Sequence, residues 1–227
     1  MYFTKTLFFF LFLFSHCLIR AQDDIIVYWQ PAVALNYDVA TNYSHNLSLS
    51  NRNYLVEGKE FVLRTRQIDI AHFSKLKIRD NQSLGLGLQY RFRETFEPDK
   101  ANELRITEQY NLTWNPRQIR WGFRFRVEQR LIPKTTIHRF RSRLAVDGPL
   151  EGERLDPGES YFVSSFENLL SMERAQEPQH DLRLTLSLGW LINADLKIQS
   201  GIEYRLENYT KRTQPILFLL TAAIFSL

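Results

Sequence analysis

The stretch SLGLGLQYRFRE, residues 83–94, decides the fold. Every second residue is apolar, namely Leu84, Leu86, Leu88, Tyr90 and Phe92. The residues between them are small or polar and end in Arg91 and Arg93, so the two sets differ in character. A period of two residues places successive side chains on opposite faces of a β-strand. The stretch therefore predicts a strand with one apolar face and one polar, cationic face.

The same period recurs along the chain. It is found in IIVYWQPAVALNYDV (25–39), ELRITEQYNLTW (103–114), IRWGFRFRVEQR (119–130), LRLTLSLGW (182–190) and LKIQSGIEYRLE (196–207). Glu108 interrupts the apolar row of its segment. No segment after the N-terminal region keeps a helical period, so the sequence predicts an all-β protein.

The alternating segments and the polar stretches between them give eleven candidate strands. These are residues 25–38, 42–50, 61–78, 83–93, 103–114, 117–131, 135–147, 159–171, 180–192, 196–208 and 213–227. Short turns such as RDNQ, NPRQ and NAD alternate with longer connections such as EPDKAN and RLIPKTT, although 148–159 is too long for its place. Bacterial single-chain barrels have even strand numbers. We therefore expect ten to twelve strands and favour twelve, with either a missed strand around 51–66 or one spurious strand.

A soluble β-sandwich would also alternate, but three features favour a transmembrane antiparallel up-and-down β-barrel. The segments are 9 residues or longer, enough to cross a bilayer when tilted, whereas soluble strands average about five or six residues. Aromatic residues gather toward strand ends, with Trp114 and Trp121 flanking one turn and Trp190 preceding another. The polar face is too rich in arginine for a sandwich core. A closed barrel pairs every backbone group within lipid, and its apolar face would then point outward.

The first residues, MYFTKTLFFFLFLFSHCLIRAQ, predict a cleaved secretory signal peptide. Lys5 supplies a positive charge, an apolar run follows, and Ala21 is a small residue at a plausible cleavage position. The predicted domains are a signal peptide at 1–21 and one barrel at 22–227. The only cysteine, Cys17, lies in the signal, which excludes disulfides and thiolate sites from the exported chain.

Charge and motif content exclude several function classes. The formal net charge is +4, without blocks of like charge, so nucleic-acid binding has no support. The histidines after the signal are scattered and form no close pair in sequence, so no metal site or other cofactor site is expected. We weighed an interfacial hydrolase using Ser142, Ser164 or Ser165 with one of these histidines. No recognisable nucleophile motif accompanies them, so the chain is not expected to be an enzyme.

Several segments together resemble a barrel family of Bacteroidota known as domain of unknown function 2490. They are a tryptophan-bearing first strand after the terminal AQ of the signal, then LGLGLQYRF, HRFRSRLAV and DPGESYFVSSFENLL. The resemblance covers essentially the whole exported chain, and Leu227 departs from the more usual aromatic C-terminus. It implies a small outer-membrane barrel and supplies no activity or catalytic residue.

The polar face is expected to line the lumen of the barrel. The predicted lumen-lining residues are Arg91, Arg93, Arg105, Arg120, Arg124, Arg126, Arg130, Arg139, Arg141, Arg143, Arg183, Arg205, Glu103, Glu128 and Glu203. In one interpretation the arginines pair with these acids and with Glu207 to fill a narrow lumen of a structural envelope barrel. In the alternative they line a narrow porin-like channel for anionic solutes or acidic oligosaccharides. Both place a monomer in the bacterial outer membrane, in contact with lipid and inserted by the barrel assembly machinery.

Overall fold

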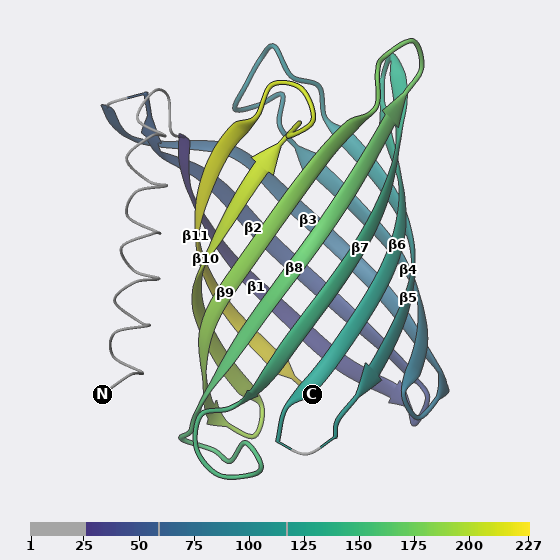
Figure 1. Cartoon of the computed structure of the whole chain (residues 1–227), viewed down its shortest axis with the longest axis vertical. Helices are drawn as coiled ribbons and strands as arrows, with labels where there is room; N and C mark the ends of the chain where they lie inside the picture. The colour runs from purple at the N-terminus through teal and green to yellow at the C-terminus, as the bar shows by residue number, and fades with distance from the viewer. Residues whose placement is uncertain (1–25, 59, 117) are drawn as a thin grey trace.

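The computed structural model describes residues 26–227, apart from 59 and 117, and these residues form one closed β-barrel (Figure 1). The predicted signal peptide lies outside the described residues. The strands are β1 (Ile26–Ala40), β2 (Tyr43–Glu57), β3 (Glu60–Arg79), β4 (Gln82–Phe92), β5 (Glu103–Trp114), β6 (Arg120–Ile132), β7 (Thr135–Pro149), β8 (Ser160–Glu173), β9 (Gln179–Asn193), β10 (Leu196–Glu207) and β11 (Gln214–Ser226).

The all-β prediction is confirmed, and each of the eleven candidate segments corresponds to one strand. The favoured number of twelve is wrong. An even number is needed only if every neighbouring pair is antiparallel, and here β1 pairs with β11 in parallel, from Ile26 opposite Ile216 to Asn36 opposite Ser226. The first and last strands therefore close an odd-numbered barrel without an unpaired edge.

The region around 51–66 contains a hairpin rather than an additional strand. The second strand continues to Glu57, seven residues beyond its predicted end, and β3 begins at Glu60. Gly58 has a φ of +66°, a left-handed conformation that glycine adopts without steric cost. Register shifts between Arg52 and Asn53 and after Tyr54 break the alternation in this part of the sheet, which is why the sequence pattern was lost there.

The two ends of the barrel differ in their connections. We call the end with the β4–β5 connection, 93–102, the loop end, and the end with the β1–β2 connection, 41–42, the turn end. The chain terminates at the turn end (Figure 1). The expected separation of short and long connections holds only in part. The β6–β7 turn at the loop end has two residues, 133–134, whereas 150–159 forms a long connection at the turn end.

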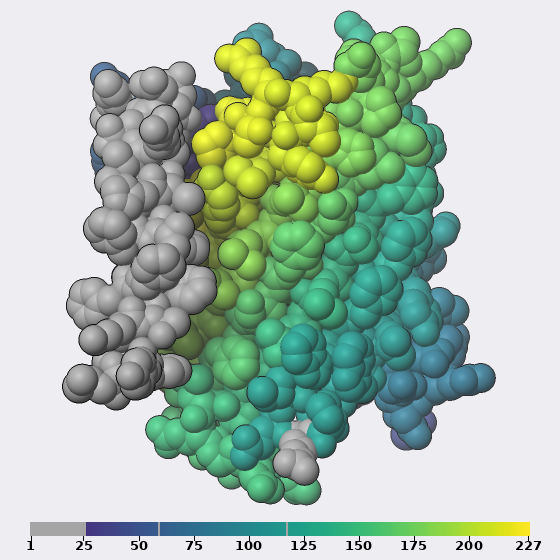
Figure 2. Space-filling model, viewed as in Figure 1, coloured from purple at the N-terminus to yellow at the C-terminus, as the bar shows by residue number. Residues whose placement is uncertain are grey.

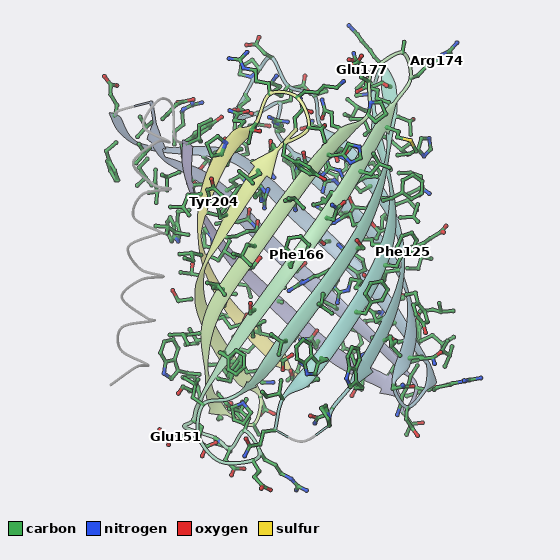
Figure 3. The ribbon with its side chains drawn as sticks, viewed as in Figure 1. Phe125, Glu151, Phe166, Arg174, Glu177 and Tyr204 are labelled. Atoms are coloured by element: carbon green, nitrogen blue, oxygen red, sulfur yellow. The ribbon has the colours of Figure 1, made fainter. Side chains whose placement is uncertain are left out.

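The outer face of the barrel is apolar. Figure 2 shows the side chains as a continuous surface over the strands facing the viewer, and Figure 3 places Phe125, Phe166 and Tyr204 along this wall. Exposed apolar side chains on the outer face include Leu84, Leu86, Leu88, Phe123, Phe125, Leu144, Phe166, Leu184, Leu186, Leu188, Ile198 and Ile202. Large exposed apolar surfaces on a protein mark contact with a partner or a membrane.

Aromatic contacts lie on this face toward the two ends of the barrel. Trp114 and Trp121 stack with ring centroids 6.2 Å apart at the turn end, and Tyr90 and Phe92 meet at 4.7 Å near the loop end. The outward His45 and His72 also stack near the turn end, with a 2.8 Å hydrogen bond between their ring nitrogens. Rings with one polar edge suit the boundary between an apolar and an aqueous phase. Across the described residues, no helix is long and apolar enough to cross a membrane.

Aromatic rings inside the barrel lie against glycines of the neighbouring strand. A Cβ atom built on Gly87 of β4 would lie 2.2 Å from the ring of Phe73, its cross-strand partner on β3. The absence of a side chain at Gly87 therefore allows Phe73 to lie flat on the inner wall, and Arg126 covers that ring at 5.2 Å.

Replacing Gly87→Ala should destabilise the barrel by about 1–3 kcal/mol, because Phe73 must leave its position. Gly122→Ala is the matched control, since the nearest atom to a Cβ there is 4.0 Å away. The free energy of unfolding in urea, measured for both variants in the same lipid or detergent, tests this. Equal stabilities for the two variants would contradict the packing role of Gly87.

Candidate functional site

The interior of the barrel has two parts. Toward the loop end lies a group of buried ion pairs, and we call this part the charged layer. Its members are Asp69, Arg91, Glu103, Arg105, Arg126, Glu128, Arg130, Arg141, Glu167, Arg183, Glu203 and Arg205. Toward the turn end a cavity of about 1000 Å³ remains, which we call the vestibule.

One group of the charged layer centres on Glu103 of β5, which is almost fully buried. Arg130 makes a bidentate contact with it, in which Nε donates to Oε1 at 2.6 Å and Nη2 donates to Oε2 at 2.8 Å. Arg105 donates to the same carboxylate, and Arg91 approaches it at 3.6 Å. Arg91 in turn binds Asp69 in the same bidentate geometry, at 2.7 and 3.0 Å. These charge-assisted pairs fix side chains from four strands, β3 to β6.

A second group centres on Arg141 of β7. Its Nη1 lies 2.5 Å from Glu128 Oε1 on β6, and its Nη2 lies 2.8 Å from Glu167 Oε2 on β8. Arg126 adds a 3.6 Å contact to Glu128, and Arg183 adds a 3.8 Å contact to Glu167. The strand register produces this arrangement, since Glu128 faces the β7 arginines and Glu167 lies opposite Arg143 and Arg183.

Toward the loop end, a cluster of aromatic rings contacts the β4–β5 connection. Tyr28, Tyr54 and Phe218 pack together, and the guanidinium of Arg52 lies 4.8 Å from the Phe218 ring. Glu97 of the connection folds onto this cluster and accepts a hydrogen bond of 2.5 Å from the Tyr54 hydroxyl. The connection is therefore held against this cluster by one of its own residues.

The charges around Glu97 keep it ionised. Burial raises the pKa of Glu97, but hydrogen bonds from Tyr54 and Arg93 and the charge of Arg66 outweigh burial, so the pKa lies below the ordinary value of 4.5. Its contribution to stability is therefore complete at neutral pH and is lost only as the pH falls below that value.

The vestibule lies beneath the charged layer and is lined by residues from both halves of the chain. Its wall carries amide and hydroxyl side chains together with an excess of cationic groups. Asn111, which receives a hydrogen bond of 2.7 Å from Arg124, and Gln109, which receives one of 2.8 Å from Arg126, mark the transition between the two parts.

The structure places the fifteen predicted residues in five settings. Arg91, Arg105, Arg126, Arg130, Arg141, Arg183, Arg205, Glu103, Glu128 and Glu203 belong to the charged layer. Arg93 binds Glu97 at the loop end, and Arg120 binds Asp147 at the turn end. Arg139 donates to Ser171 at 2.8 Å, while Arg124 and Arg143 line the vestibule. Glu207, expected to pair with an arginine, forms no ion pair within the part of the chain that the structure describes.

Sequence reasoning missed Arg52, Arg66, Asp69, Glu97 and Glu167. Arg52 and Arg66 lie at a bulge between β2 and β3, where a period of two no longer assigns faces, and Glu97 lies in a connection. Asp69 could have been found, because it precedes the outward Ile70 in a regular part of β3. Glu167 could have been found, because it follows the outward Phe166 in a regular strand. In residues 26–227, apart from 59 and 117, no group of three or more potential metal ligands occurs.

Replacing Glu128→Gln should lower the free energy of unfolding by about 3–5 kcal/mol, because it leaves Arg126 without a buried counter-charge and Arg141 with Glu167 alone. Glu128 is only 1% exposed. Glu57→Gln is the matched control, since its ion pair with Arg64 is exposed and surface pairs contribute about 1 kcal/mol or less. Denaturant unfolding of both variants provides the measurement, and a similar small loss at both positions would contradict the role assigned to Glu128.

Comparison with known proteins places the chain in a family. The model of a protein family of unknown function, DUF2490, matches residues 28–215, which extend from β1 to the beginning of β11. Searches of curated proteins and of solved structures each found no match. The matched range includes almost the entire barrel, and the chain therefore belongs to the DUF2490 family.

Proposed function

We propose that this chain is an integral β-barrel of the bacterial outer membrane, with a charge-filled lumen, and that it serves as a structural component of the envelope. The observation that carries the proposal is the opposition of the two faces of one sheet. The outer face exposes leucine and aromatic side chains, whereas the inner face buries paired arginines and acids. Such a sheet is stable when its outer face meets hydrocarbon and its closed backbone needs no water.

The charged layer supports a lumen that does not conduct. Arg126 of β6 reaches the ring of Phe73 on β3, and Arg141 joins side chains from the strands on both sides of it. Glu97 adds a second obstruction at the loop end. An ion crossing the barrel would have to separate several buried ion pairs, each costly to break.

A narrow channel for anionic solutes is the second candidate function. The observation that favours it is the excess of cationic side chains in the vestibule, which would attract anions from the turn end. Passage beyond the vestibule would require the charged layer to open.

Conductance in planar bilayers separates the two functions. We expect the wild-type barrel to insert without producing current steps, because the charged layer fills the lumen. The double replacement Arg124→Ala and Arg126→Ala should chiefly lower stability. Anion-selective steps in the wild type, with selectivity reduced in the double variant, would contradict the closed barrel and support the channel.

The membrane assignment is tested by Glu108, an exposed residue at the middle of β5 on the apolar face, opposite Leu86 and Val127. A carboxylate facing hydrocarbon is costly, so Glu108→Leu should stabilise the barrel in lipid vesicles by about 1–2 kcal/mol. Glu151→Leu, in the turn-end connection shown in Figure 3, should change stability by less than about 0.5 kcal/mol.

Cell fractionation provides the complementary measurement for the same assignment. The protein should remain with the outer membrane until detergent is added. A freely soluble periplasmic protein, with no gain in stability from Glu108→Leu, would overturn the assignment.

A further inference from the structure

The vestibule has more cationic than acidic side chains in its wall. The cationic residues are Lys75, Lys77, Arg120, Arg124, Arg143, Arg154 and Lys197, and the acidic residues are Asp80, Asp147 and Glu153. Two of the acids are already engaged, since Asp80 binds Lys77 at 3.1 Å and Asp147 binds Arg120 at 3.0 Å. The remaining positive charge therefore has too few carboxylates to balance it within the wall.

Arg124 and Arg143 are the most unusual pair in this wall. They lie directly opposite each other on β6 and β7, where like charges repel. Within the described chain neither forms an ion pair, and the Nε of Arg143 is buried without a hydrogen-bond partner. A buried donor left without an acceptor costs free energy. An anion placed between the two guanidinium groups would remove both costs.

The Arg124 guanidinium is held in position by other side chains. Its Nε donates to Asn111 Oδ1 at 2.7 Å, and the Asn111 amide donates to Ser83 Oγ at 3.1 Å. This chain of hydrogen bonds crosses β4, β5 and β6 and leaves the terminal nitrogens of Arg124 available. A cationic group fixed before binding loses little side-chain entropy when a ligand arrives.

The part of the wall formed by β8 to β10 is also ordered. Tyr161 of β8 lies against Gly189 of β9, its cross-strand partner, and its hydroxyl accepts a hydrogen bond of 2.9 Å from Gln199. Lys197 lies 5.9 Å from the Tyr161 ring. An amide, a phenol and an ammonium group therefore line the vestibule together with the arginine pair and offer hydrogen bonds to a polar ligand.

We propose that the vestibule is a binding pocket, open at the turn end, for a small organic anion with a hydroxylated body, such as an acidic saccharide. Arg124 and Arg143 bind its carboxylate, sulfate or phosphate group, because guanidinium groups bind such oxyanions with two hydrogen bonds. The volume of about 1000 Å³ is large enough for a ligand of disaccharide size. The inference rests on the proposed function in one respect, because the charged layer forms the inner end of the pocket.

The experiment measures binding of digalacturonate by calorimetry to the full-length barrel in a zwitterionic detergent, with neutral maltose as the comparison ligand. Digalacturonate should bind and maltose should not. Arg124→Gln and Arg143→Gln should each weaken binding roughly tenfold or more, because each removes charge-assisted hydrogen bonds to the anion. Arg139→Gln is the matched control. It also removes an inward arginine without an ion pair, but outside the vestibule, and should leave binding unchanged.

Thermal unfolding provides a second measurement. Its expected result would not follow if the two arginines had a purely structural role. Without ligand, Arg143→Gln should unfold at the same or a higher temperature than the wild type, because repulsion with Arg124 is relieved. Digalacturonate should raise the unfolding temperature of the wild type and not that of the variant.

Two results would overturn the pocket. One is equal binding of digalacturonate by the wild type and by folded Arg124→Gln and Arg143→Gln variants. The other is binding of maltose as tight as that of digalacturonate. Because binding is measured in detergent, neither result depends on conductance or cell location, so failure of the proposed function and failure of the pocket are distinguishable.

Discussion

Closure of the sheet is the constraint on which the rest of the structure depends. The parallel pairing of β1 with β11 removes the last open edge, and backbone groups along the described strands then find partners within the sheet. Closure also divides the side chains into two sets that never mix, one outside and one inside. In an open sheet, one of the two sets of side chains would not have a uniform environment. A closed barrel gives the outward side chains one environment and the inward side chains another.

The interior shows how a narrow lumen accommodates many charges. Near the loop end the arginines bind acids through two guanidinium nitrogens. Glu103 and Arg141 each bind the side chains of more than one other residue. Near the turn end acids are fewer, and Arg124 and Arg143 face each other without forming an ion pair in the described chain. Arginines therefore form ion pairs in one part of the lumen and line an open cavity in the other, because the number of nearby carboxylates differs between the two parts.

Part of the fold and of the site was predictable because alternation is a local property. A period of two residues assigns faces wherever a strand is regular, so the inward arginines of β4, β6 and β7 could be identified from SLGLGLQYRFRE and its equivalents. Arg52 and Arg66 could not, because the bulge at which they lie shifts the faces. Glu97 could not either, because a loop residue has no periodic neighbour that indicates where its side chain points.

The sequence by itself determined an all-β chain, its eleven segments and the two chemical faces of each regular strand. The tertiary structure alone decided the strand number, since the parallel pairing of β1 with β11 is what closes a barrel of eleven strands. It also decided which arginines have partners and which do not. Pairing depends on register between strands and on distance across the lumen, and neither quantity is written in the order of residues along one strand.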